Sequence, residues 1–230
     1  MSGADDYTEY TTLQFLDEYA PEIPSPKPLG VLRIGVLSLI FTSYIPGTTL
    51  ETIWPQLTVD QKLSVKDQLE TVLTDLRSIK WPPNAPLGGV QGEGCKDLRR
   101  NIRRSNSLIF SLEQFDDFQF SNLRYGSKFF VEFLRKFASG SSCRVCFSHG
   151  DVRPANIMVQ KNVDGQFEIS GLLDWEFSGF YPEHFESTKV TNCLGTDETS
   201  DWYNYLPSCL SPHTWPRRWL LDYVLGRHLD

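Results

Sequence analysis

The stretch that decides the fold is SHGDVRPANIMV, residues 148–159, which carries a His, an Asp, an Arg and an Asn and ends in an apolar run. An Asp–Gly pair at 164–165 favours a hairpin turn between this run and a second apolar stretch at 167–173. The hairpin would place Asn156 and Asp174, at the two strand ends, on the same side. Asp151 would lie in the loop just before them.

This grouping of side chains suits phosphoryl transfer. Amide and carboxylate oxygens are the ligands that Mg²⁺ prefers, and a further carboxylate can accept the proton of an incoming hydroxyl. The residues also allow simpler interpretations. Asn156 could cap a turn, and Arg153 could be the partner of a surface ion pair.

The motifs resemble those of a known family. HGD-x4-N at 149–156 and LLDWE at 172–176 resemble the catalytic core of the aminoglycoside phosphotransferase/choline kinase family, small-molecule relatives of the protein kinases. GFYPEHFE at 179–186, IPSPK at 23–27 and YIPG at 44–47 resemble its fungal branch. The resemblance therefore extends over most of the chain and implies an enzyme that phosphorylates a small-molecule hydroxyl or amine.

The resemblance also implies a role for each matched residue. Asp151 would be the catalytic base, and Asn156 and Asp174 would bind Mg²⁺. Arg153 stands where protein kinases carry a Lys that contacts the transferred phosphate, and His149 would brace the loop.

The nucleotide would bind at a second segment. The resemblance makes Ser43, Tyr44 and Ile45 the hinge, whose backbone groups bind the adenine of ATP. The implied cofactors are accordingly Mg²⁺ and ATP.

The expected fold class is α+β and protein-kinase-like. Residues 1–47 would form a rudimentary N-lobe and residues 48–230 a mostly helical C-lobe. Apolar periodicity predicts helices at 5–19, 58–80 and 122–138. In the last helix, aromatic side chains share one face, which we expect in the core; they are Phe129, Phe130, Phe133 and Phe137.

The N-lobe expectation has a gap. In kinases a Gly-rich loop and a strand Lys precede a helix that carries a Glu. Here the helix at 5–19 would be that helix, with Glu9 as the best candidate and Glu18 as the second, but no such loop or Lys precedes it. Three interpretations stay open: a truncated kinase, a short chain whose cleft has been repurposed for other chemistry on a small metabolite, or a non-catalytic interaction module.

Composition narrows the function classes. The 230 residues carry a net charge of −7, which argues against a nucleic-acid partner. No N-terminal signal is visible, and the most apolar run, 31–41, is too short to span a membrane. Five scattered cysteines favour free thiols in a reducing, cytoplasmic setting; Cys143-x-x-Cys146 lacks a second pair for zinc. Oligomeric state stays open.

Overall fold

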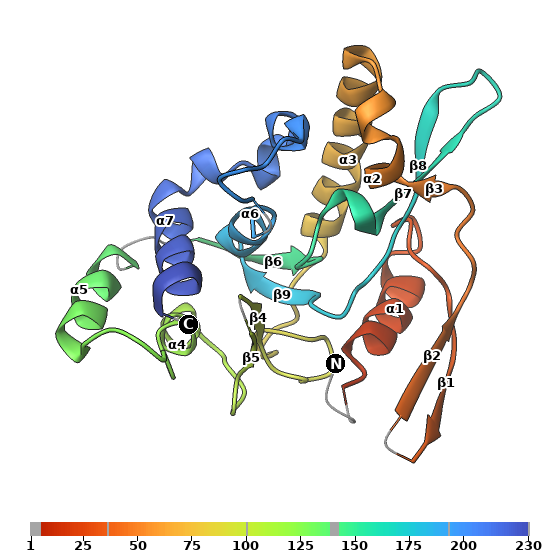
Figure 1. Cartoon of the computed structure of the whole chain (residues 1–230). Helices are drawn as coiled ribbons and strands as arrows, with labels where there is room; N and C mark the ends of the chain where they lie inside the picture. The colour runs from red at the N-terminus through yellow and green to blue at the C-terminus, as the bar shows by residue number, and fades with distance from the viewer. Residues whose placement is uncertain (1–5, 36, 100, 139–142, 193, 230) are drawn as a thin grey trace.

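The computed structural model describes residues 6–35, 37–99, 101–138, 143–192 and 194–229. Helices and strands are mixed along the chain, and the strands form four small antiparallel sheets (Figure 1). The α-helices are α1 (Thr8–Tyr19), α2 (Leu50–Ile53), α3 (Val59–Ser78), α4 (Leu112–Gln119), α5 (Lys128–Ala138), α6 (His184–Lys189) and α7 (Pro216–Val224). The strands are β1 (Pro28–Ile34), β2 (Leu37–Thr42), β3 (Thr48–Thr49), β4 (Lys96–Leu98), β5 (Ile102–Arg104), β6 (Val145–Ser148), β7 (Ile157–Lys161), β8 (Phe167–Leu172) and β9 (Gly179–Pro182).

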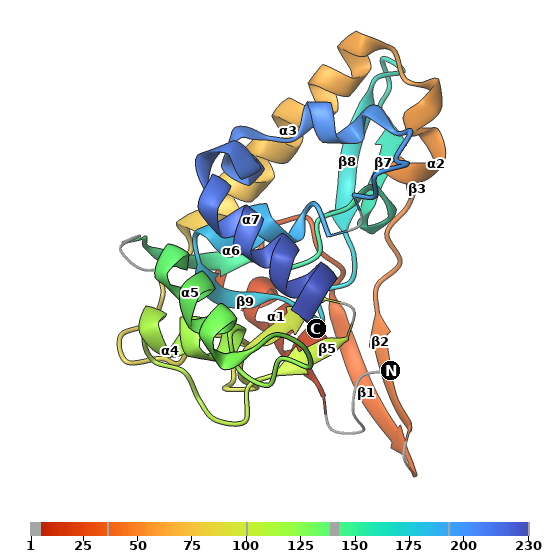
Figure 2. The ribbon, with the colours of Figure 1, turned by 60° about the vertical axis from the view of Figure 1, so that its left-hand side comes forward.

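Strands β1 and β2 form a hairpin that stands beside α1 at one side of the molecule (Figures 1 and 2). The chain turns tightly at Gly35, whose φ of 61° lies in the left-handed region that favours glycine. Alternate residues of β2 face α1, whereas Leu37, Leu39 and Phe41 point outward and are exposed. The hairpin thus buries only one of its faces.

Strands β3, β7 and β8 form the sheet that carries the deciding motif. The predicted β7–β8 hairpin is confirmed: Ile157 pairs with Leu172, and Gly165 turns the chain with a φ of 76°. Thr48 of β3 pairs with Val159, so the chain after Gly47 joins this sheet. Because the first pair closes one end of the hairpin, the residues just before β7 and just after β8 lie together.

Helix α3 is the longest helix and supports this sheet. Thr58 and Gln61 form the predicted capping box, each side chain bonding the other residue's backbone N–H. Its buried face, Val65, Leu69, Leu73 and Leu76, belongs to the main core and contacts β6 and β8. The core therefore lies between α3 and the strands that carry the deciding motif.

A glycine-rich loop, residues 88–94, connects α3 to β4 and lies against β9. Gly88, Gly92 and Gly94 all have φ between 81° and 101°, a range that favours glycine and allows the loop its tight turns. Gly88 and Phe180 exchange backbone hydrogen bonds of 2.8 and 2.9 Å. The loop thereby fastens β4 and β5 beside the β6–β9 sheet.

The expectation for the helix at 122–138 is wrong in two respects. Helix α5 begins at Lys128, and its phenylalanines are exposed, with Phe129 at 82%. Only Leu134 and Ala138 are fully buried, in a small cluster with α7. Helix α7 covers only part of the apolar face of α5. The periodicity of the sequence shows that these residues share one face, but it does not show whether another element covers that face.

Four cysteines are free in the described part of the chain: Cys95, Cys143, Cys146 and Cys209. Cys95 and Cys146 are buried, and Cys146 takes up the position expected of a buried thiol. Cys193 lies outside the described residues. None of the described helices is both long and apolar enough to cross a membrane.

Candidate active site

The loop between β6 and β7 holds the deciding motif, and His149 fastens it from within. The backbone N–H of Asp151 donates to His149 Nδ1 at 3.3 Å, so the proton lies on Nε2, which donates to the Leu173 carbonyl at 2.9 Å. Burial lowers the pKa of His149 to about 4, so the ring is neutral near pH 7. The histidine therefore ties the loop to the end of β8, directly before Asp174.

Glu186 of α6 also holds this loop, through its backbone. Its carboxylate accepts the backbone N–H groups of His149 at 2.6 Å and Gly150 at 2.9 Å. Gly150 has a φ of 88°, and a Cβ there would collide with the Phe177 carbonyl, so only glycine fits. Burial raises the pKa of Glu186 to about 7, although the Gly150 N–H and Arg77 act to lower it.

Asp151 and Asn156 are joined directly. Asn156 Nδ2 donates to both the backbone carbonyl and Oδ2 of Asp151, each at 2.9 Å. Because the amide nitrogen makes both bonds, the Oδ1 oxygen of Asn156 is the atom left to act as a ligand. The turn-cap interpretation of Asn156 therefore accounts for its Nδ2 group but not for its Oδ1 oxygen.

Arg153 also contacts Asp151. Its Nε donates to Oδ2 at 3.0 Å, and the arginine side chain is 43% exposed while the Asp151 side chain is 12% exposed. The ion pair proposed as the simpler interpretation of Arg153 is thus present. It is made with the candidate base itself, and the outer part of the guanidinium faces solvent.

Asp174 completes the group in an unusual backbone conformation. Its φ of 66° lies in the left-handed region, which non-glycine residues adopt mainly at turns and functional sites. Burial, and then the nearby charge of Asp151, raise the pKa of Asp174, whereas Arg153 acts to lower it. The carboxylates of Asp151 and Asp174 repel each other, and a cation bound between them would stabilise the ionised form of both.

Helix α1 brings a further carboxylate to the site. Burial, and then the charges of Asp174 and Glu176, raise the pKa of Glu9, while the Trp175 backbone N–H acts to lower it. Glu9 therefore stands beside the segment that carries Asp174, on the helix where the sequence placed it.

Lys96 is the residue that sequence reasoning missed here. Its ammonium is buried and bonds Asp6 Oδ1 at 2.8 Å and the Glu176 carbonyl at 2.6 Å. Burial opposes ionisation of Asp6, but the hydrogen bonds from Lys96 and Thr8 lower its pKa to about 2. Lys96 thus ties the start of α1 to the segment after Asp174, and no local motif indicated this contact.

The expected hinge residues, Ser43–Ile45, lie between β2 and β3. Ser43 is occupied, since its backbone N–H donates to Lys27 O and its hydroxyl accepts from Lys27 N. In the described part of the chain, no hydrogen bond to protein is found for the backbone N–H groups of Tyr44 and Ile45. The Ile45 side chain covers Gly171 of β8.

The donor set fits Mg²⁺ bound together with phosphate. Asn156 and Asp174 offer hard oxygen atoms, and the mutual repulsion of Asp174 and Asp151 is what a divalent cation would relieve. No group of three or more His, Cys, Asp or Glu side chains in the described residues forms a metal cage.

Solved structures share this fold. The crystal structure of an aminoglycoside-3'-phosphotransferase of type VIII matches with a TM-score of 0.52 and 19% identity, covering 96% of this chain and 72% of that one. The complex of APH(2")-IIa with gentamicin matches with a TM-score of 0.61 and 16% identity over 96% and 71%. Its ternary complex with streptomycin and ATP gives 0.58 and 14% over 94% and 70%. At these identities the likeness establishes the protein-kinase-like fold.

Sequence comparison establishes the family. No curated protein matches the chain. The model of the phosphotransferase enzyme family, however, matches residues 7–208, which include the loop between β6 and β7, the β7–β8 hairpin and α6. The fungal branch stays a prediction. With most of its length matched by that one model, this protein belongs to the phosphotransferase enzyme family.

Proposed function

We propose that the protein is an ATP- and Mg²⁺-dependent phosphotransferase that acts on a hydroxyl or amine of a small molecule. The observation that carries the proposal is the hydrogen bond between Asn156 and Asp151, together with the electrostatic coupling of Asp151 to Asp174. Phosphoryl transfer depends mostly on positioning and charge neutralisation, and these residues supply both.

Each residue has a defined part in this proposal. Asp151 Oδ2 accepts from Asn156 and Arg153, which leaves Oδ1 to accept the proton of the acceptor group. Arg153, held at Asp151 and partly exposed, is placed to bind an oxygen of the transferred phosphoryl group. Asn156 Oδ1 and Asp174 would hold Mg²⁺, which when bound neutralises the phosphate charge.

His149 and Glu186 act through the loop and not on substrate. Glu186 accepts the backbone N–H groups of His149 and Gly150, and the His149 ring accepts the backbone N–H of Asp151. These bonds hold the backbone of the loop and thereby orient the Asp151 carboxylate. On the nucleotide side, the open N–H groups of Tyr44 and Ile45 are the donors proposed for adenine.

Calorimetric titration with ATP at about 1 mM, with and without Mg²⁺, tests the proposal. We expect binding heat that requires Mg²⁺ and is lost in Asp174→Asn. Asp164→Asn, the same chemical change at the exposed turn of the same hairpin, is the matched control and should bind as wild type does. Absence of Mg²⁺-dependent nucleotide binding in the folded wild-type protein would refute the proposal.

A further inference from the structure

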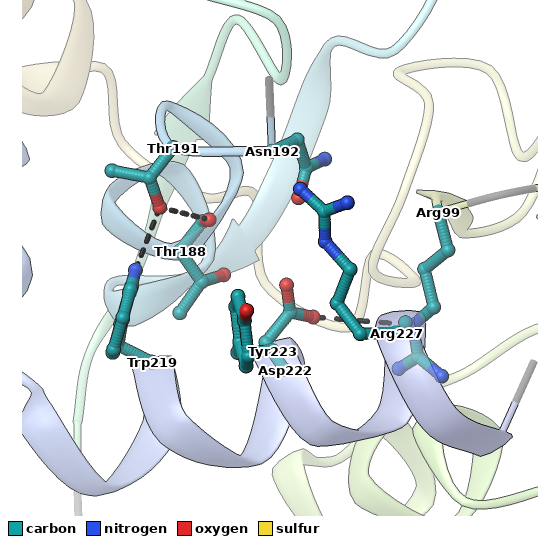
Figure 3. A pocket seen from close by; sticks show the side chains of 9 residues that line it. Arg99, Thr188, Thr191, Asn192, Trp219, Asp222, Tyr223 and Arg227 are labelled. Carbon is teal, nitrogen blue, oxygen red and sulfur yellow. Dashed lines mark hydrogen bonds and ion pairs between the residues drawn. The ribbon is translucent and has the colours of Figure 1, made fainter. Parts of the chain in front are cut away.

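A cavity of about 160 Å³ lies beside α7 (Figure 3). Residues after β4, at the end of α6 and along α7 line it, and most of the lining groups are polar. Arg99 and Arg227 both border it, together with the amide of Asn192. No motif in the sequence indicated this cavity.

Arg99 is the distinctive group of the cavity. Its side chain is 1% exposed, Nη1 donates to the Gln119 carbonyl at 3.3 Å, and Nη2 pairs with Asp97 at 2.9 Å. Its Nε makes no hydrogen bond with any described residue and faces Asp222, whose Oδ1 is 3.9 Å away (Figure 3). Its ion pair with Asp222 is long and leaves the buried Nε–H without a hydrogen bond, so a better-placed acceptor at the cavity would complete its bonding.

The carboxylates nearby are already shared. Asp97 is paired with Lys189 at 2.6 Å as well as with Arg99 and Arg103, and Lys189 also holds Asp222 at 2.6 Å. Asp222 is thus bonded to the Lys189 ammonium and lies farther from Arg99 Nε. Its negative charge is paired before any ligand enters the cavity.

Two further residues at the cavity, Asn192 and Arg227, carry N–H donors. Asn192 uses one amide N–H for the Leu98 carbonyl at 2.9 Å, which leaves its second N–H. Arg227 adds positive charge at the rim, where its Nη2 donates to the Leu194 carbonyl. The Trp219 and Tyr223 rings form one wall and are stacked with centroids 5.6 Å apart.

We propose that this cavity binds a small oxyanion, a carboxylate or phosphoryl group, between Arg99, Asn192 and Arg227. An oxyanion offers several acceptors to the fork of a guanidinium, whereas a cation would meet two arginines. The proposal does not depend on phosphotransferase activity, because none of these residues belongs to the catalytic loop.

The test follows the indole N–H resonance of Trp219, whose Nε1 donates to Thr191 at 2.7 Å at the cavity wall. Trp219→Phe identifies this resonance among those of the other tryptophans. Acetate and inorganic phosphate are titrated separately at constant ionic strength, so the two arms distinguish a carboxylate site from a phosphoryl site. We expect a saturable shift with at least one of them.

Three variants assign the shift to the cavity. Arg99→Lys keeps the charge but loses the fork, and should weaken binding about tenfold. Arg227→Gln should weaken it about threefold, whereas Arg217→Gln, an equally exposed arginine of α7 outside the cavity, should not change it. No saturable shift at about 50 mM of either anion, or a shift that Arg99→Lys and Arg227→Gln leave unchanged, overturns the proposal. If Arg99→Lys does not fold, Asn192→Leu, which fills the cavity, replaces it with the same expectation.

Discussion

The loop between β6 and β7, which holds the candidate active site, and the β1–β2 hairpin, which leads into the candidate hinge, are built differently. The loop is held by buried side chains, with His149 and Glu186 fixing its backbone at four hydrogen bonds between 2.6 and 3.3 Å. The hairpin is held by α1 on one face and exposes Leu37 and Leu39 on the other. Chemistry that depends on exact positioning is therefore concentrated on the loop side.

The largest expected effect is on the loop side. Asp151→Asn should lower the rate of phosphoryl transfer by about 10²–10⁴, because the amide cannot accept the acceptor's proton. Mg²⁺-dependent ATP binding should persist, since Asn156 and Asp174 are unchanged. Phosphorus NMR of ATP consumption measures the rate, and Asp164→Asn is the control. A rate close to wild type in Asp151→Asn contradicts the assignment of the base.

Much of this side was predictable from the sequence. The Asp164–Gly165 turn and the flanking apolar runs are local signals, and a hairpin necessarily brings its two strand ends together. The capping box of α3 was readable for the same reason. Asn156 and Asp174 could therefore be placed together before any coordinates were known.

The supporting contacts could not be predicted. Glu186 meets a backbone N–H 37 residues away, and Lys96 meets the Glu176 carbonyl 80 residues away. Contacts of this kind depend on how whole elements pack against each other. No local sequence pattern around Glu186 or Lys96 predicts them. The exposed phenylalanines of α5 illustrate the same limit, since a shared helix face does not reveal whether another element covers it.

The next largest effect concerns the tie between α1 and the Asp174 segment. Lys96→Met should lower the free energy of unfolding by about 3 kcal/mol, because it leaves the Asp6 carboxylate and the Glu176 carbonyl without the buried ammonium. Denaturant titration measures the loss. Arg104 still pairs with Asp6 at 2.6 Å, so the protein should remain folded.

Adding Asp6→Asn gives the control for this pair. The double variant should recover about half of the loss, because the buried carboxylate is no longer charged. If the double variant is destabilised by the sum of the two single losses, the two side chains act independently and the tie is not a coupled pair.

A smaller effect appears in the pH dependence set by Glu186. Its pKa is about 7 in the folded protein and 4.5 ordinarily, so between these values the folded state keeps a proton that the unfolded state releases. The stability that the raised pKa contributes is present below pH 4.5 and lost as pH rises through 7. The free energy of unfolding should fall across this window by on the order of 3 kcal/mol.

Glu186→Gln removes this titration. Its unfolding free energy should be lower than that of wild type at pH 4.5, since the amide cannot accept two N–H groups, but flatter between pH 4.5 and 7. Glu113→Gln, the same change at an exposed position of α4, should keep the wild-type slope. Equal slopes for wild type and Glu186→Gln would show that Glu186 titrates normally.

The smallest effect on the free energy of unfolding is expected at the outward face of the β1–β2 hairpin. This effect tests whether the hairpin is less firmly packed than the loop. Leu39→Thr removes an outward side chain that is 43% exposed, and should change the free energy of unfolding by less than about 0.5 kcal/mol. Ile40→Thr, the next residue on the face toward α1, should cost about 1–2 kcal/mol because a hydroxyl replaces packed apolar surface. Threonine suits a strand, so backbone propensity is matched in both variants. A larger loss for Leu39→Thr than for Ile40→Thr would mean that the outward face is covered in solution, and the hairpin would then be as firmly packed as the loop.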